Sequence, residues 1–122
     1  MRRLWFIALL AVIVGSLLPG SSAPLRALSL LHVSDKLQHF GAYAVLACLP
    51  AWMASRPSPV RTGAWLMAMG ILLELFQTLV PGRSCDFFDG LSDAAGIVVG
   101  LLFGASCVVL RDSIAPAKVA EG

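Results

Sequence analysis

The chain has 122 residues, of which 58% are hydrophobic and only 13% are charged. Soluble domains contain about 25% charged residues, so this chain has too few charges to cover a surface exposed to water. The composition therefore argues against a soluble enzyme and indicates one compact membrane domain, residues 1–122. The net charge of +2 is too small to indicate a nucleic-acid partner.

Four apolar segments are predicted to cross the membrane, which gives an all-α bundle of four transmembrane helices. A spanning helix needs about 20 predominantly apolar residues, with a range of about 17–25. Pro57 and Pro59 separate the second segment from the third, and Pro81-Gly82 ends the third. The four segments are residues 4–18, 37–54, 62–81 and 90–110.

The first segment has a second interpretation as a cleavable signal peptide. Arg2 and Arg3 precede its apolar core, and Ser21-Ser22-Ala23 resembles a cleavage site. Pro24 would follow the cut, which is unfavourable, so we favour an uncleaved anchor.

Residues 24–34, which follow this segment, are too short to span a membrane. Leu25, Leu28 and Leu31 recur there at helical spacing. The stretch is therefore interpreted either as a segment lying on the outer surface of the membrane or as an ordinary loop.

Lysines and arginines in the short loops predict the orientation of the chain. If each segment spans once, one side holds three of them, namely Arg26, Lys36 and Arg83. This predicts a multi-pass protein of the cell membrane with both termini in the cytoplasm. The other six lie on the cytoplasmic side: Arg2, Arg3, Arg56, Arg61, Arg111 and Lys118.

Ionisable residues gather at the predicted outer ends of the last three segments. A charge at the centre of a spanning helix costs about 2.5–3.5 kcal/mol on insertion scales, so a chain that keeps such groups needs partners or a polar cavity for them. Asp86, in the loop beside them, is expected to be solvated. The predicted outer-face pocket comprises Asp35, Lys36, His39, Tyr43, Glu74, Gln77, Arg83, Asp89 and Asp93.

Helical spacing places the members of this pocket on shared faces. Asp35, His39 and Tyr43 are each four residues apart, so His39 could be satisfied by Asp35. Asp35 could also be the N-cap of its helix, with Ser34 as the alternative cap. Glu74 lies deepest, and we expect it to pair with a cation of the cluster or to stay protonated. The candidate cations for Glu74 are Arg83, Lys36 and His39.

A glycine stripe continues the acidic face of the fourth segment. Asp89 and Asp93 fall in one row with Gly96, Gly100 and Gly104 at about 100° per residue. Small residues repeated at this spacing let another helix approach closely. The face that packs should therefore point Asp93 inward.

These motifs together resemble the VanZ-like family of membrane proteins. The run Asp35-Lys36-x-x-His39-Phe40-x-x-Tyr43 is similar to the DKxxHFxxY motif of that family. Glu74-x-x-Gln77, then Pro81-Gly82-Arg83 and Asp89, resemble its second block, and Gly96 and Gly100 close it. The resemblance is strongest over residues 35–104. Family members usually have asparagine where this chain has Asp93, so the cluster here carries an added carboxylate.

The resemblance implies a small helical domain of the cell envelope, and the founding members are associated with low-level resistance to glycopeptide antibiotics such as teicoplanin. We expect the pocket to bind a membrane lipid or a lipid-linked envelope precursor and to influence glycopeptide susceptibility. A structural polar network that fixes helix packing is a further interpretation.

The alternative function is a membrane-embedded hydrolase or transferase acting on a lipid-linked phosphate. An Asp-His pair would be its general base and Glu74 its acid, while Arg83 and Lys36 would hold the phosphate. No nucleophile is signalled, so the catalytic residues stay unassigned. The three cysteines lack zinc-type spacing, so no metal site and no cofactor are expected, although a carboxylate cluster could bind a divalent cation through oxygen.

Overall fold

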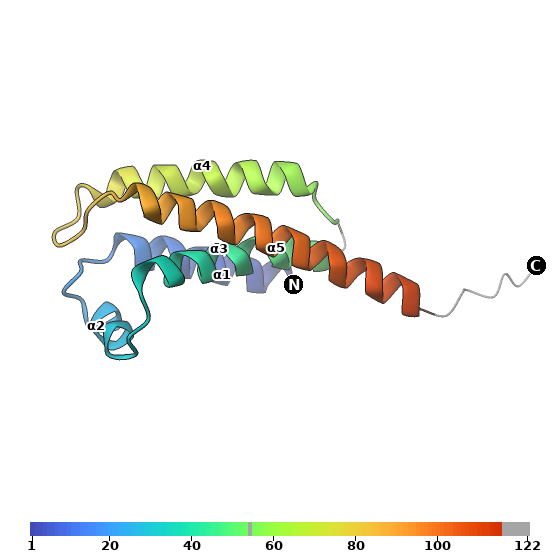
Figure 1. Cartoon of the computed structure of the whole chain (residues 1–122), viewed down its shortest axis with the longest axis horizontal. Helices are drawn as coiled ribbons and strands as arrows, with labels where there is room; N and C mark the ends of the chain where they lie inside the picture. The colour runs from blue at the N-terminus through green and yellow to red at the C-terminus, as the bar shows by residue number, and fades with distance from the viewer. Residues whose placement is uncertain (54, 116–122) are drawn as a thin grey trace, which may run out of the picture.

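The structure is a computed structural model that describes residues 1–53 and 55–115, and these residues form helices and no strands. The all-α prediction is therefore confirmed for the described part of the chain. Lys118, which was used to predict the orientation, lies outside the described residues. Helices α1, α3, α4 and α5 run along the long axis of the molecule, and α2 lies at one end (Figure 1). The elements are α1 (Arg2–Leu17), α2 (Ala23–Leu30), α3 (Asp35–Cys48), η1 (Leu49–Trp52), α4 (Pro59–Gln77) and α5 (Phe87–Ile114).

Two of the described helices, α4 with 19 residues and α5 with 28, are long and apolar enough to cross a membrane. At 1.5 Å per residue they measure about 28 Å and about 42 Å. Helices α1 and α3, with 16 and 14 residues, are shorter than the segments needed for four complete helical spans. The short helix α2 begins at Ala23 and ends at Leu30, so it includes Leu25 and Leu28 of the predicted leucine pattern, and Leu31 is its C-cap.

The second predicted segment is divided at Pro50, which begins the 3-10 turn η1 together with Leu49. Proline has no N–H and cannot donate to the carbonyl four residues earlier, which is that of Leu46. This carbonyl instead accepts a 2.9 Å hydrogen bond from the indole Nε1 of Trp5 on α1. A residue of the first helix therefore satisfies the backbone group that the proline of the second leaves free.

Helices α3 and α5 pack with their backbones in contact, as the glycine stripe predicts. A Cβ atom built on Gly96 would overlap the carbonyl oxygen of Phe40, and one built on Gly100 would overlap that of Ala44. Because no side chain separates the two helices there, residues that flank the contact are brought to within hydrogen-bonding distance. The inward orientation expected for Asp93, one turn before Gly96, is confirmed, since Asp93 is 1% exposed.

Many large apolar side chains are exposed and several polar side chains are buried, beside an apolar core that includes Leu46, Leu66 and Ile97. Large apolar side chains such as Leu10, Ile71 and Phe103 are more than half exposed on the outer faces of α1, α4 and α5. Soluble monomers rarely expose large continuous apolar surfaces. The buried residues include four polar ones, which are Glu74, Gln77, Asp89 and Asp93.

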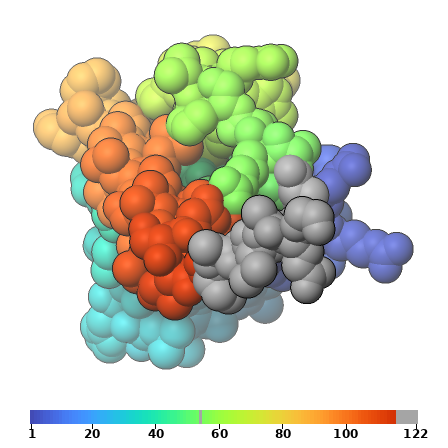
Figure 2. Space-filling model, turned by 90° about the vertical axis from the view of Figure 1, so that its right-hand side faces the viewer, coloured from blue at the N-terminus to red at the C-terminus, as the bar shows by residue number. Residues whose placement is uncertain are grey.

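The end of the molecule opposite α2 carries several of the arginines assigned to one side of the membrane. Viewed from this end, the start of α4, the end of α5 and the N-terminal residues lie around one face (Figure 2). Arg2 and Arg61 line one cavity there, and Arg56 pairs with Asp112 at 3.3 Å. The buried polar groups of α4 and α5 lie toward the opposite end, where α2 is found.

Candidate functional site

A hydrogen-bonded histidine and aspartate form the centre of the polar cluster. His39 lies in the second turn of α3 and Asp93 in the second turn of α5, and the Nδ1–Oδ1 distance is 2.8 Å. One proton lies between the two atoms, whether His39 donates to an ionised Asp93 or a protonated Asp93 donates to the ring. The expectation that Asp35 satisfies His39 is wrong, because the backbone contact at Gly96 brings a buried carboxylate of another helix closer.

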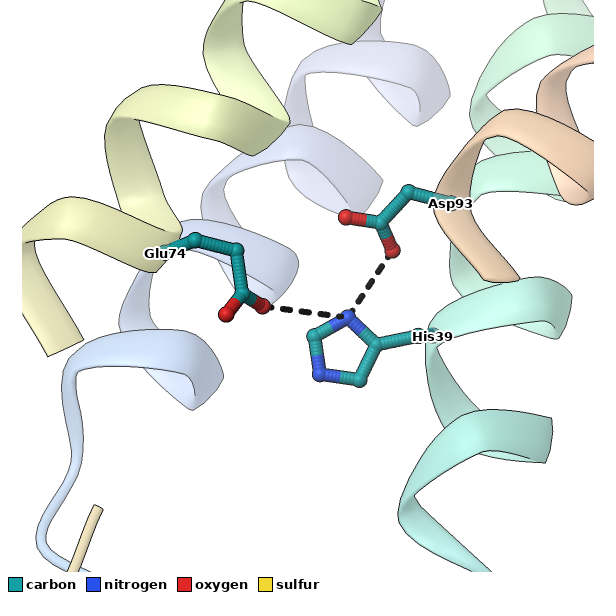
Figure 3. A group of neighbouring side chains, drawn as sticks. All are labelled: His39, Glu74 and Asp93. Carbon is teal, nitrogen blue, oxygen red and sulfur yellow. Dashed lines mark hydrogen bonds and ion pairs between the residues drawn. The ribbon is translucent and has the colours of Figure 1, made fainter. Parts of the chain in front are cut away.

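A third helix, α4, contributes Glu74 to the cluster. Its Oε1 lies 3.9 Å from Nδ1 of His39, and its Oε2 accepts a 3.3 Å hydrogen bond from the backbone N–H of Asp86. Among the cations expected for Glu74, the structure therefore selects His39. The three side chains point toward one another from three helices (Figure 3).

Because Gly70 has no side chain, the side chains of the cluster have room to approach one another. Gly70 lies one turn before Glu74 on α4, and a Cβ there would lie 3.1 Å from both Oδ2 of Asp93 and the hydroxyl of Tyr43. Tyr43 is 2% exposed, so its ring forms part of the wall below the cluster. The residue type at position 70 thus allows α4 to close against α3 and α5.

The acidic cluster continues outward to Lys36 through Asp89. Oδ2 of Asp89 lies 3.8 Å from Nε2 of His39, and its Oδ1 lies 3.6 Å from Nζ of Lys36. Lys36 also donates a 3.0 Å hydrogen bond to Asp86, which raises the pKa of Lys36 above its usual value. The pKa of Asp86 is lowered by the hydrogen bond from the Phe88 N–H and then by that from Lys36.

Ser34 and Asp86, rather than Asp35, begin the helices that carry the cluster. The Ser34 hydroxyl accepts from the Leu37 N–H at 3.2 Å, so Ser34 is the N-cap of α3 and Asp35 is an exposed residue of its first turn. Asp86 caps α5 and also pairs with Lys36, so it belongs to the cluster although it is expected from sequence to be solvated. Its position just before a helical apolar run was the signal that could have indicated this role.

Arg83 and Gln77 do not pair with the carboxylates but bind the end of α1. Arg83 donates to the carbonyl of Gly15 at 2.9 Å, and Gln77 donates to that of Ser16 at 3.0 Å. The last four carbonyls of a helix have no partner within the helix, so both side chains satisfy otherwise free groups. The participation of α1 in the site was not expected from the sequence.

A cavity of about 360 Å³ lies beside the cluster between α1, α2 and α3. Apolar residues of α1 and α2, including Val12 and Leu28, line one part of it, and Gln38, His39 and Arg83 line another. A second cavity of about 260 Å³ shares Leu25, Asp35, Gln38 and Arg83 with the first and adds a second arginine, Arg26. The two cavities together form an amphipathic space with His39 and Arg83 on its wall.

The arrangement offers two kinds of chemistry. A histidine hydrogen-bonded to a buried carboxylate is the arrangement of a general base. Ring and carboxylate atoms of His39, Glu74 and Asp93 also lie within 4.8 Å of one another, which is close enough to suggest metal ligands. No metal-ligand spacing is visible in the sequence because these three residues come from three different helices.

Comparisons of the chain with protein-family models, with curated proteins and with solved structures found no match. What the cluster does must therefore be inferred from its own residues.

Proposed function

We propose that the chain is a VanZ-like membrane protein of four spans that binds the phosphate headgroup of an envelope lipid or lipid-linked precursor. Helices α4 and α5 supply two spans, α3 continues directly into η1 to form a third, and α1 forms the fourth. The exposed apolar side chains of α1, α4 and α5 would face lipid. Both termini would lie in the cytoplasm, with the polar cluster near the outer face.

The observation that carries the proposal is the amphipathic space between α1, α2 and α3. Its apolar part, lined by residues such as Val12 and Leu28, suits a hydrocarbon chain, and its polar part holds Arg83 beside Arg26. Its volume of about 360 Å³ lies in the range of ligand pockets, about 300–1,000 Å³. Arginine binds phosphate through paired N–H groups.

Arg83 has a donor to spare for such a ligand. Its terminal nitrogen is bonded to the Gly15 carbonyl, but its Nε is buried and has no hydrogen-bond partner among the described residues. A buried donor without a partner costs about 1–3 kcal/mol. A phosphate oxygen in the adjoining cavity would remove this cost once the guanidinium turns Nε toward the cavity, so binding should stabilise the folded chain.

The proposal is tested by lipid binding to the purified full chain in detergent micelles. A polyprenyl phosphate should bind and raise the melting temperature, whereas the matching polyprenol, which lacks only the phosphate, should bind at least about tenfold more weakly, a difference of about 1.4 kcal/mol. Arg83→Gln keeps a donor for the Gly15 carbonyl and should abolish the preference for phosphate. Arg61→Gln, at the opposite end, is the matched control and should preserve it.

Equal binding of the phosphate and the alcohol would refute a phosphate site. Phosphatidylglycerol is a third ligand, and its binding in place of the polyprenyl phosphate would assign the site to bulk membrane lipid. In cells, expression should raise the concentration of teicoplanin needed to inhibit growth, and Arg83→Gln should abolish the effect at unchanged membrane abundance.

A second candidate function, a phosphohydrolase, is favoured by one observation: His39 lines the same cavity and is hydrogen-bonded to Asp93. His39 would take a proton from water while the water oxygen attacks the terminal phosphorus of a lipid diphosphate, and the bridging P–O bond would break to release inorganic phosphate. His39→Gln should then abolish phosphate release while lipid binding persists. Absence of release from the wild-type chain would exclude this function.

A further inference from the structure

We propose that His39, Glu74 and Asp93 bind one divalent transition-metal cation, such as Zn²⁺ or Mn²⁺. Each residue offers one ligand atom, and these atoms lie within 4.8 Å of one another (Figure 3). An imidazole nitrogen with carboxylate oxygens is a donor set that suits these ions better than Mg²⁺ or Ca²⁺, which prefer oxygen alone. The site does not require the proposed lipid ligand, since all three ligands belong to the protein.

One carboxylate oxygen of Glu74 faces the cluster and makes no hydrogen bond among the described residues. Glu74 is 6% exposed, and this oxygen is its Oε1. The nearest nitrogen is Nδ1 of His39 at 3.9 Å, and that atom is already bonded to Asp93 at 2.8 Å. Oε1 is therefore available as a ligand atom inside the cluster. A cation between the three side chains would serve all of them at once.

The charges around His39, Glu74 and Asp93 also favour a bound cation. Lys36 is exposed and pairs with Asp86 and Asp89, and Arg83 is directed to the carbonyl of Gly15. Within the described residues, His39 is therefore the cationic partner within reach of both Glu74 and Asp93. One histidine carries at most one positive charge, whereas one divalent cation balances two carboxylates.

The far side of the imidazole ring already has the environment of a metal ligand. A histidine that binds a metal almost always donates its other ring N–H to a carboxylate or carbonyl, which fixes the ring. Nε2 of His39 faces Oδ2 of Asp89 at 3.8 Å, and Lys36 balances Asp89 at 3.6 Å. Oδ1 of Asp89 is buried and has no hydrogen bond in the described structure, so no hydrogen bond from this oxygen competes with the ring. Asp89 is thus a positioning residue for the site.

Binding requires little movement of the protein. Two atoms bound to one Zn²⁺ at about 2.0–2.2 Å are at most about 4.4 Å apart. The candidate ligand atoms of the three side chains now lie within 4.8 Å of one another. Rotation of the flexible Glu74 side chain can close this difference. The proton now held between His39 and Asp93 would leave as the cation takes its place.

The test is metal uptake by the full chain, purified in detergent micelles and stripped with a chelator. After dialysis against Zn²⁺ or Mn²⁺, elemental analysis should find about one ion per chain, as expected for a single closed site. Glu74→Gln and Asp93→Asn preserve shape and should each weaken binding by more than about 100-fold, while Asp89→Asn should weaken it by about 10–100-fold. Asp112→Asn, which removes an exposed carboxylate at the other end, is the matched control and should bind as the wild type does.

Two results would overturn the site. One is a wild-type chain that takes up neither cation in stoichiometric amount, a measurement that depends on no variant. The other is uptake that survives both Glu74→Gln and Asp93→Asn. If these variants do not fold, the melting temperature of the wild type decides the matter, because it must rise with Zn²⁺ or Mn²⁺ and return to its starting value with chelator.

Discussion

A single methyl group added at Gly100 should separate α3 from α5 and break the centre of the cluster. A Cβ at this position would lie 2.9 Å from the Cα of Ala44, whereas carbon atoms in contact are about 3.5–4.0 Å apart. The helices must therefore move apart by at least about 0.6 Å. Across the same interface, such a shift would stretch the 2.8 Å contact between His39 and Asp93 to the limit of a hydrogen bond.

The expected change in the free energy of unfolding follows from three effects. Overpacking costs about 1–3 kcal/mol, and loss of a hydrogen bond to a charged group costs about 1.5–3 kcal/mol. Alanine returns about 0.8–1.0 kcal/mol through its higher helix propensity. Gly100→Ala should therefore destabilise the chain by about 1.5–5 kcal/mol.

Gly90→Ala is the matched control, because it makes the same change in the same helix. A Cβ at Gly90 would have no atom within 4 Å, so this variant should be as stable as the wild type or more stable by up to about 1 kcal/mol. Unfolding of both variants in mixed micelles, followed by far-UV circular dichroism during titration with a denaturing detergent, measures the difference. If Gly100→Ala proves no less stable than Gly90→Ala, α3 and α5 are not in backbone contact and the reasoning fails.

Three further predictions concern topology, packing and charge. Cys85 is exposed and should react with an impermeant thiol reagent added to intact cells; reaction only after lysis would reverse the proposed orientation. Trp5→Phe leaves the Leu46 carbonyl unpaired and should lower the free energy of unfolding by about 1–3 kcal/mol, and an unchanged value would show that this bond is dispensable. The pKa of Asp86 lies below its usual 3.8 because the N–H group at the start of α5 and then Lys36 bind its ionised form, so its stabilisation is present above pH 3.8 and disappears as the pH falls through the lowered pKa. The stability difference between the wild type and Asp86→Asn should therefore shrink in that window, and a difference that grows would contradict the assignment.

The helical content and the inward face of α5 could be predicted from the sequence because both depend on local patterns. Apolar runs of about 20 residues indicate helices, and the repeat of Gly96 and Gly100 places them with Asp93 on one face. These inferences need no knowledge of which helix is the neighbour. The structure confirms the close approach and identifies α3 as the helix that makes it.

The pairing within the cluster could not be predicted, because it depends on distances between helices. Spacing correctly placed Asp35 and His39 on one side of a helix, but it could not show that Asp93 lies closer to the ring. Arg83 was expected as a possible partner of Glu74, and it donates instead to the Gly15 carbonyl of a helix that carries no ionisable residue beyond its first turn. A free carbonyl at a helix end leaves no trace in the amino-acid pattern.

The unequal packing of the helices has a consequence for how a ligand could enter and leave. Helix α3 packs far more extensively against α5 than α4 does against either of them. His39, Asp89 and Asp93 therefore lie on the two helices that pack most extensively, whereas Glu74 lies on the less extensively packed α4. Tilting of α4 about its loop to α5 would work as a gate, opening the cluster without disturbing the histidine–aspartate bond. A covalent cross-link between α4 and α5 should then slow ligand exchange in both directions while leaving the equilibrium affinity almost unchanged.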